Sequence, residues 1–360
     1  MIKAGEDVWV FAPEYHRLKI KEDKIVTLPG VFAFPDRFRP KIWPTSSPKP
    51  KVIKESGFDI IHSHHFYTPF RYSLDFAKSS GAPHVASFYR LFPEYETKKS
   101  SISLSSAYQK SVRNLTNLAN SASRVISLSK GSKQYLQDLG VSNQIDVAPV
   151  GIFTKDYASY PPQAIYEKFK IPRERKIILY VARLEGDANL EFLLRAFKLV
   201  WKAIDDVQLL IIGGGSSESE LRKLVQMQPF SDYITITGFL PKNQVNKIYG
   251  VADLFVYPKS LDPEPLSVIE ALAAGTPVVA VEGYGINDFL KHNEEGLITA
   301  PTVEAFAKGI SELLRRDQLR LGFSMRARLK AREFRASNTT HFLLELYNSV
   351  LTGKTNRKMF

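Results

Sequence analysis

The sequence predicts an α/β protein with two doubly wound parallel sheets, one in each half of the chain. Short apolar runs alternate with segments of helical periodicity, which is typical of parallel sheets covered by helices on both faces. The alternation restarts after the proline-containing segment Tyr160-Pro161-Pro162. A chain of 360 residues is long enough for two domains.

In the first half, short runs rich in apolar and β-branched residues predict strands. These lie at Val8–Ala12, Ile25–Leu28, Asp59–His62, His84–Phe88, Arg124–Leu128 and Asp146–Val150. Apolar residues at helical spacing predict helices at Phe70–Ser79, Ser103–Ala119 and Gly131–Leu139. In Val31–Trp43, basic residues alternate with aromatic ones, and we predict a packed loop there, with an interfacial patch as the alternative.

The second half repeats the pattern. Strands are predicted at Lys176–Ala182, Gln208–Gly213, Tyr233–Thr237, Leu254–Tyr257 and Pro277–Val281. Helices are predicted at Leu190–Ala203, Ser219–Gln226, Lys242–Tyr249, Pro265–Ala274, Val303–Arg315, Gln318–Phe334 and Thr340–Leu351. We place the join between the domains near Gly151–Arg175. The domains are then 1–155 and 156–335, and we expect the helix within 336–360 to cross back to the first domain.

Composition excludes several classes of protein. The chain has no cysteine, which rules out disulfides, thiol catalysis and thiolate zinc sites and fits a reducing compartment. No run of about 18 apolar residues is present, so no segment is expected to span a membrane. Residues 1–150 hold 21 Lys/Arg and 13 Asp/Glu, which is +8 of the net charge of +12. Such a basic half fits contact with anionic lipid, an acidic glycan or nucleic acid, or alternatively a plain solvated surface.

The segment 252–281 is the most informative part of the chain. A strand is followed by a loop with two carboxylates, Asp262 and Glu264, and by a helix that begins near Pro265 and carries Glu270. Free N–H groups at a helix N-terminus suit a diphosphate, and nearby carboxylates suit sugar hydroxyls. These are the requirements of a site for a nucleotide-sugar.

Further segments complete a recognisable set. They are GFDIIHSHH at 57–65, VISLSKGSKQYLQDLGV at 125–141, APVGI at 148–152, YVARL at 180–184, LLIIGGG at 209–215 and ITGFLP at 236–241. Together with 252–281 the set resembles glycosyltransferase family four, whose members have the GT-B fold. The resemblance implies two facing domains and a retaining hexose transfer from a nucleotide-diphosphate sugar, with no metal or other cofactor.

One early segment narrows the resemblance. LPGVFAFPDRFRP at 28–40 is similar to members that glycosylate diacylglycerol or phosphatidylinositol. This implies a lipid or glycan as acceptor, and a cytoplasmic enzyme that contacts the inner face of an anionic membrane. Nucleic acid is not expected as a partner.

The family signature is Glu, seven residues, Glu, and here Asp262 and Glu270 fill the two positions. The resemblance implies that Glu270 binds the ribose hydroxyls and that Asp262 faces the donor sugar or its phosphate. Glu264 takes that place if the loop shifts. Alternatively, Glu270 is on a solvated helix face. The N–H groups of Leu266 and Ser267 are expected to donate to the phosphates, and the Ser267 hydroxyl either adds a bond or caps the helix.

Arg183 follows a buried strand, and its guanidinium offers a fixed fork of donors for a diphosphate. It matches the donor-phosphate arginine of the family, and the alternative is a surface ion pair with Glu185 or Asp187. The family places a lysine five residues later, but this chain has Ala188 there. Lys130 and Lys259 are candidate replacements.

Glycine-rich loops complete the expected donor site. Gly214 follows one strand, and the segment from Gly238 to Pro241 resembles the family loop that packs on the nucleotide base. The run 213–215 lacks the third glycine of a dinucleotide fingerprint, because that position holds Glu218. We therefore reject NAD.

The acceptor side is expected at the ends of strands in the first half. By alternation, His62 and His64 share one face, and the resemblance implies an acceptor pocket there, with a hydrogen-bonded structural histidine as the alternative. No carboxylate or cysteine lies at metal-ligand spacing, so no metal is expected. Many family members have a histidine after the next strand, where this chain has Tyr89. A tyrosine can bind a sugar hydroxyl, but near neutral pH it is a poor proton acceptor.

A further departure concerns the N-terminus. AGEDVWVFAP resembles the end of the first helix and the second strand of the family, so we expect the first strand of the sheet to be missing. These departures keep two other functions open. One is a non-catalytic relative that binds a sugar-nucleotide or serves as a partner subunit, and the other is a sugar-nucleotide epimerase.

Overall fold

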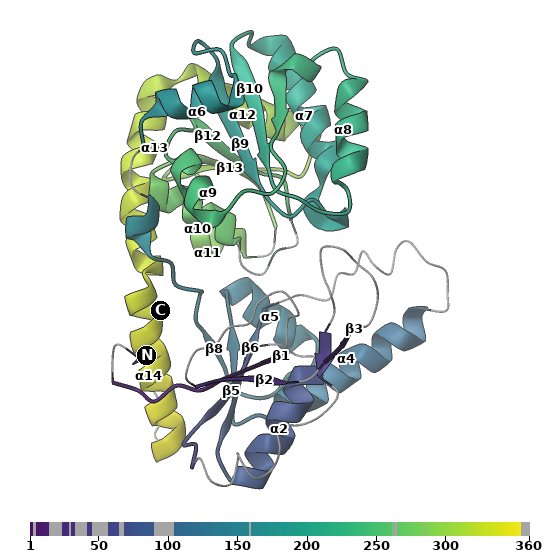
Figure 1. The fold of residues 1–360 in the computed structure, drawn as a ribbon, viewed down its shortest axis with the longest axis vertical. Coiled ribbons are helices and arrows are strands. Elements are labelled where there is room, and N and C mark those ends of the chain that lie inside the picture. Colours follow the sequence, from purple (N-terminus) through teal and green to yellow (C-terminus); the bar gives the residue numbers. More distant parts are fainter. Residues whose placement is uncertain are drawn as a thin grey trace. The chain divides into compact units, whose positions relative to one another are not determined.

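The computed structural model describes residues 1–2, 5–13, 24–28, 30–32, 42–44, 57–64, 68–89, 104–157, 160–260, 262, 265–283 and 285–353. The chain forms two compact units (Figure 1). Unit 1 consists of Met1–Pro149 with Thr339–Phe360, and unit 2 consists of Val150–Asn338. Each unit contains a parallel sheet flanked by helices, so the α/β prediction is confirmed.

Unit 2 is built on a six-stranded parallel sheet in the order β11-β10-β9-β12-β13-β14. The strands are β9 (Lys176–Val181), β10 (Val207–Ile212), β11 (Ile234–Ile236), β12 (Leu254–Tyr257), β13 (Val278–Val281) and β14 (Gly296–Thr299). The chain moves outward from β9 to β11 and then returns to place β12 on the other side of β9. The order therefore reverses between β9 and β12, and in sheets of this kind ligands bind at such a switch point, beyond the carboxyl ends of the strands.

Helices cover both faces of this sheet. They are α6 (Pro162–Phe169), α7 (Leu190–Ala203), α8 (Glu218–Gln226), α9 (Lys242–Tyr249), α10 (Leu266–Ala274), α11 (Ile286–Phe289), α12 (Val303–Arg315) and α13 (Asp317–Lys330). Along β9, Ile178 and Tyr180 pack in one core with residues of α7, α8 and α12. Ile177 and Leu179 pack in the other core with residues of α6, α9 and α10. Because both faces are buried, the strands are almost wholly apolar, which made them visible in the sequence.

Unit 1 has a smaller parallel sheet in the order β5-β6-β7-β8. Its strands are β5 (Ile61–Ser63), β6 (His84–Phe88), β7 (Arg124–Ser127) and β8 (Ile145–Val147), with helices α2 (Thr68–Ser80), α4 (Leu104–Ser121) and α5 (Lys130–Asp138). Two strands, β1 (Val10–Pro13) and β2 (Ile25–Leu28), form a separate parallel pair. Within the described residues, β5 is the end strand of its sheet and β1 pairs only with β2.

The last helix, α14 (Ala336–Thr352), packs on unit 1. Its Leu346 is buried against Val85 of β6, Ile126 of β7 and Ala148. Phe334 lies just before α14, and Ile152 lies where the chain enters unit 2. The Ile152 amide donates to the Phe334 carbonyl at 2.8 Å, which pairs the two segments. The two stretches of chain that pass between the units are thus tied together at their unit 2 ends.

Some elements differ from the prediction. The stretch Val31–Trp43, predicted as a loop, contributes an antiparallel pair of strands, β3 (Gly30–Phe32) and β4 (Ile42–Pro44). The join segment at Gly151–Arg175 contains α6, whose Ile165 lies in a core of unit 2. The short elements β14 and α11 were also not predicted. Each has only four residues, which is too few to show a period.

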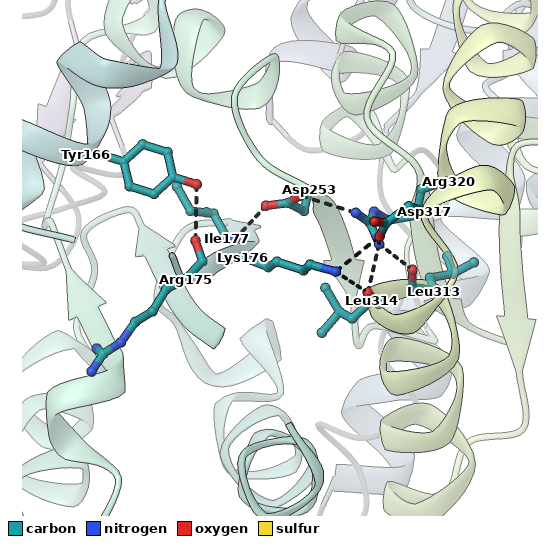
Figure 2. Close-up of polar contacts among 9 residues, drawn as sticks. All are labelled: Tyr166, Arg175, Lys176, Ile177, Asp253, Leu313, Leu314, Asp317 and Arg320. Atoms are coloured by element: carbon teal, nitrogen blue, oxygen red, sulfur yellow. Dashed lines mark hydrogen bonds and ion pairs between the residues drawn. The ribbon is translucent and has the colours of Figure 1, made fainter. Parts of the chain in front are cut away.

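A polar network supports the amino-terminal edge of the unit 2 sheet (Figure 2). Asp253 immediately precedes β12 and accepts the Ile177 amide of β9 at 2.8 Å. Arg320 of α13 lies 3.6 Å from the same carboxylate, and its guanidinium also donates to the carbonyls that end α12. Lys176 joins the network through the Leu314 carbonyl. The network therefore connects the two central strands with α12 and α13.

We predict that Asp253→Ala lowers the free energy of unfolding of unit 2 by about 1–3 kcal/mol, because it leaves the buried Ile177 amide without its acceptor. Urea unfolding followed by fluorescence measures this loss. Asp317→Ala is the matched control, since its carboxylate belongs to the same network but is mostly exposed. It should give a clearly smaller loss, and equal losses would contradict the account.

Candidate functional site

The carboxyl edge of the unit 2 sheet brings together the loops in which the sequence places donor-site residues. The loop after β10 lies directly against the loop after β9. At Gly213, where φ is +143°, a Cβ atom would lie 1.8 Å from the carbonyl oxygen of Ala182. Only glycine allows this approach. The Leu184 amide then donates to the Gly214 carbonyl at 3.1 Å, which fixes the two loops to each other.

The loops after β12 and β13 are joined in the same way. A Cβ atom at Gly283 would lie 2.2 Å from the carbonyl oxygen of Ser260. On the other side, the side-chain amide of Asn189, which precedes α7, donates to the Pro258 carbonyl at 2.7 Å. The loops on both sides of the switch point are therefore held in fixed positions before any ligand binds.

Helix α10 begins at this edge. The amides of Val268 and Ile269 donate to the Pro265 carbonyl at 2.8 and 3.2 Å. Within the described residues, the amides of Leu266 and Ser267 have no acceptor, and no side chain caps the helix. Ser267 is therefore not a cap here. The exposed N–H groups and the helix dipole make this end of α10 suited to an anion.

Glu270 lies one turn further along α10, with its carboxylate largely enclosed. The Tyr157 hydroxyl donates to Oε1 at 2.8 Å, and the Tyr249 hydroxyl donates to Oε2 at 2.9 Å. Lys242 Nζ lies 3.8 Å from Oε1, and 12% of the Glu270 side chain remains exposed. The solvated helix face that we considered for Glu270 is therefore wrong. Its carboxylate is oriented, and a small part of it is open to a ligand.

Asp262 lies in the loop after β12, and the Tyr257 hydroxyl at the end of that strand donates to its Oδ2 at 2.5 Å. Glu264, the alternative partner for the donor sugar, lies outside the described residues. Both described carboxylates of the signature are thus hydrogen-bonded to tyrosines. Tyr157 and Tyr249 could not be predicted from a local pattern, because they are 113 and 21 residues away from Glu270. Tyr257 could have been noticed as the polar end of an apolar strand.

Arg183 follows β9, on the other side of the switch point from α10. Its side chain is exposed, and it forms no hydrogen bond or ion pair with any side chain in the described part of the chain. Glu185, one candidate ion-pair partner, is described, whereas the side chain of Asp187 lies outside that part. Arg183 therefore follows the carboxyl end of β9, the strand that pairs with β12, and Asp262 and α10 come after β12 in the chain.

The predicted base-binding loops also meet at this edge. The Gly213 amide donates to the Gly238 carbonyl at 3.0 Å, which joins the loops after β10 and β11. Pro241 precedes α9, and its carbonyl accepts the amides of Gln244 and Val245 at 2.9 and 3.1 Å. Between them, Phe239 is 81% exposed and lies in contact range of Gly214. These loops thus offer backbone groups together with one exposed ring.

The position where the family pattern has a lysine is buried in this chain. Ala188 is completely buried, and the Tyr180 hydroxyl donates to its carbonyl at 2.6 Å. A side chain there would point into the core. Of the two candidate replacements, Lys259 follows β12 and lies in the same loop as Asp262, whereas Lys130 begins α5 in unit 1.

The three acceptor-side residues meet in unit 1, at the ends of β5 and β6. His62 and His64 stack with ring centroids 4.2 Å apart, which confirms that they share a face. His64 Nδ1 hydrogen-bonds with the Tyr89 hydroxyl at 2.9 Å. His62 is held from both sides, by the hydroxyls of Tyr347 at 2.6 Å and Ser87 at 2.7 Å. His62 is thus fixed in place, and His64 is the exposed member of the pair.

Burial lowers the pKa of His62 well below its usual value, and the nearby His64 and His84 lower it further. His84, which the sequence analysis did not single out, is the first residue of β6 and is close enough to affect the pKa of His62. Its Nε2 hydrogen-bonds with Ser63 and Ser73, both at 3.0 Å. Burial lowers the pKa of His84 to about 4. Both His62 and His84 are therefore neutral at physiological pH.

We predict that acid destabilises unit 1 through these histidines. The pKa of His84 is about 4 when folded and 6.5 when free, so the unfolded state binds the extra proton. Its stabilising effect is complete above pH 6.5 and is lost as the pH falls towards 4, at up to ~1.4 kcal/mol per pH unit. Urea unfolding of the native chain and of His84→Gln at several pH values measures the difference. An equally steep pH dependence in both proteins would contradict this assignment.

Two general properties of the described residues bear on function. No three His, Cys, Asp or Glu side chains in that part of the chain are grouped so that they could hold a metal ion. Metal-free chemistry nevertheless stays a prediction. No helix there has the length and apolar character needed to cross a membrane.

Comparison with known proteins identifies both halves of the chain. Residues 1–156 match the family model described as Glycosyltransferase Family 4, and residues 163–330 match the one described as Glycosyl transferases group 1. An uncharacterized glycosyltransferase of Haemophilus influenzae is 29% identical over 177 residues, which is 48% of this chain and 49% of that protein. The matched part thus spans about half of that relative. The alpha-monoglucosyldiacylglycerol synthase of Acholeplasma laidlawii is 22% identical and matches 81% of this chain and 76% of that enzyme.

Solved structures show the same fold. The HepE protein of Anabaena in complex with UDP has a TM-score of 0.71 and 19% identity, over 83% of this chain and 81% of that one. Sucrose-phosphate synthase of Thermosynechococcus elongatus has a TM-score of 0.73 and 22% identity, over 84% and 76%. The two units of this chain therefore have the GT-B fold.

Proposed function

Because this chain belongs to the GT-B glycosyltransferases, with a group 1 domain at residues 163–330, we propose that it transfers a hexose from a nucleotide-diphosphate sugar with retention of configuration. The observation that carries this proposal is the set of groups around the switch point of the unit 2 sheet. On one side is the exposed guanidinium of Arg183, and on the other is the N-terminus of α10 with the amides of Leu266 and Ser267 exposed. Both favour a diphosphate.

The spacing along α10 supports the same ligand. Glu270 is four residues after Leu266, so it lies on the same face of the helix, about 6 Å further along. A nucleotide whose phosphates rest on the first turn would extend its ribose along that face. Glu270 then binds the ribose hydroxyls, and Asp262 or Glu264 binds the hexose. Gly214, Gly238 and Pro241 line the base, mainly through backbone groups.

The chemistry assigned to these groups is stabilisation of the leaving diphosphate. As the bond between the sugar anomeric carbon and the phosphate oxygen breaks, negative charge grows on the nucleoside diphosphate, where Arg183 and the α10 amides stabilise it. The acceptor oxygen bonds to the same face of the anomeric carbon, which retains configuration. Its proton passes to the departing phosphate oxygen, so the reaction needs no protein base at the position of Tyr89 and no metal or other cofactor.

We assign the acceptor to unit 1, where His62, His64 and Tyr89 form a hydrogen-bonded group. The acceptor is proposed to be a lipid or a glycan. The name of the Acholeplasma relative, a diacylglycerol-modifying enzyme, and the basic charge of residues 1–150 favour a lipid at the surface of an anionic membrane. We accordingly propose a cytoplasmic enzyme that acts at the inner face of the membrane.

One observation favours a second candidate, a non-catalytic relative that binds a sugar-nucleotide or accompanies an active partner. The buried Ala188 leaves no side chain at the place of the family lysine, and loss of one preorganised donor typically lowers the rate about 10²–10³-fold. The first proposal requires that Lys259, in the loop of Asp262, supply the missing charge. An epimerase is the third and least supported candidate.

The test is an assay of the full chain with UDP-, GDP- and ADP-sugars, in the presence and absence of anionic vesicles that contain diacylglycerol. Transfer to lipid with retained configuration supports the first proposal. Nucleotide binding measured by calorimetry, with no turnover of any donor, supports the non-catalytic candidate. Release of nucleotide and an epimerised sugar without an acceptor indicates an epimerase.

A further inference from the structure

The carboxylate of Glu270 is held by two tyrosines from different parts of unit 2. Tyr157 ends the short 3₁₀ helix η2 (Thr154–Tyr157), close to where the chain enters the unit, and Tyr249 is the last residue of α9. Each donates its hydroxyl to a different carboxylate oxygen, at 2.8 and 2.9 Å. Their rings pack edge to face, with centroids 6.0 Å apart. The two hydroxyls thus approach the carboxylate from one rigid aromatic pair.

Both tyrosines are fixed and remain donors. They are almost completely buried, so neither ring has room to rotate away. Burial and the negative charge of Glu270 raise the pKa of both hydroxyls well above the usual value. The phenols therefore stay protonated at physiological pH, so both hydroxyls act as donors to the carboxylate.

An ionised carboxylate has about four positions that accept hydrogen bonds. The tyrosines take one position on each oxygen, which leaves one on each for another donor. The Glu270 side chain is 12% exposed, and its Oε1 lies 3.8 Å from Lys242 Nζ. One remaining acceptor position on each of two carboxylate oxygens matches the pair of neighbouring hydroxyls of a ribose.

We infer that Tyr157 and Tyr249 are positioning residues, which orient Glu270 so that it accepts the 2′- and 3′-hydroxyls of the donor nucleotide. The inference rests on the proposed function, because it needs a ribose at Glu270. A glutamate held in this way loses little rotamer freedom when the ligand binds, whereas an untethered one must be ordered. The tyrosines should therefore raise the affinity that depends on the ribose hydroxyls and leave the rest of the binding unchanged.

The experiment compares UDP with 2′-deoxy-UDP by calorimetry, with GDP and ADP and their deoxy forms in parallel. The native chain is expected to prefer the ribonucleotide by about tenfold or more, the effect of a hydrogen bond to a charged acceptor. Tyr157→Phe and Tyr249→Phe should each reduce this preference about three- to tenfold and change the affinity for the deoxynucleotide less than about twofold. Two single variants are used so that one destabilised protein does not decide the result.

Tyr166→Phe is the matched control. Its hydroxyl, also in unit 2, donates to the Arg175 carbonyl at 3.1 Å, near the other edge of the sheet (Figure 2). It should keep the full preference, since a merely structural loss of a hydroxyl does not distinguish two nucleotides. An unchanged preference in both Glu270-contacting variants, or a higher one, overturns the inference.

Glu270→Gln separates this inference from the proposed function. If it removes the preference while the tyrosine variants keep it, Glu270 binds the ribose and only the positioning role is wrong. If it leaves the preference intact, the ribose site itself is wrong. Failure of the native chain to bind any of the nucleotides overturns both.

Discussion

Replacing Glu270 by glutamine is expected to lower kcat/KM for the nucleotide-sugar by about 10²–10⁴-fold. Each hydrogen bond to a charged acceptor contributes about 1.5–3 kcal/mol, and the carboxylate is assigned two of them to ribose. The glutamine amide also cannot accept from both tyrosines, because one of its two polar atoms is a donor. The measurement is initial transfer rate against donor concentration, with whichever sugar the native chain uses.

The expected loss has a control on the same unit. Glu312→Gln removes a half-buried carboxylate of α12 that pairs with the exposed Arg316 at 2.8 Å, one turn along the helix. Such pairs stabilise helices by only about 0.3–0.5 kcal/mol, so activity should stay near the native value. Turnover by Glu270→Gln within about twofold of the control, in a protein with native melting behaviour, would remove the basis for the donor site.

The sequence was most informative where strands are buried on both faces. Leu254–Tyr257, Leu190–Ala203 and Lys242–Tyr249 were predicted with their observed bounds, because apolar runs and helical spacing are strongest there. The strands β3 and β4 were missed, since Val31–Trp43 alternates basic and aromatic residues and gives no clear period. Helix α6 was missed because the prolines before it suggested a linker, although Pro161 and Pro162 only mark its start.

For the candidate site as well, some residues could be predicted from the sequence and others could not. Arg183, Asp262 and the start of α10 could be predicted to lie at one edge of the sheet, because each follows an apolar strand and parallel strands bring their carboxyl ends together. The partners that orient the carboxylates were not found. Tyr157 reaches Glu270 across 113 residues of chain, and contacts made by tertiary packing alone leave no local pattern. A sequence can thus predict candidate ligand-binding groups and still omit the side chains that hydrogen-bond to them.

In the proposed reaction, the buried Ala188 leaves Arg183 without the second cation that the family pattern places five residues later. Where two cations share the charge of a leaving diphosphate, loss of one is partly compensated by the other. Here the side chain at 188 points into the core and provides no charge. In the proposed reaction, stabilisation of the leaving group then depends on Arg183, on the α10 amides and on the lysine proposed for the loop after β12.

Arg183→Ala is therefore expected to lower kcat by about 10²–10³-fold, the usual effect of removing one preorganised donor to developing charge. Arg183→Lys should recover part of this loss, because an ammonium keeps the charge but lacks the two-pronged geometry that a diphosphate accepts. The stability of both variants should match the native chain, since the guanidinium is exposed and makes no contact with a described side chain that folding needs. Arg195→Ala, which removes an exposed arginine of α7, is the control and should be fully active. If Arg183→Ala changed only KM, the arginine would bind donor and transition state equally, and its assignment to the leaving group would be wrong.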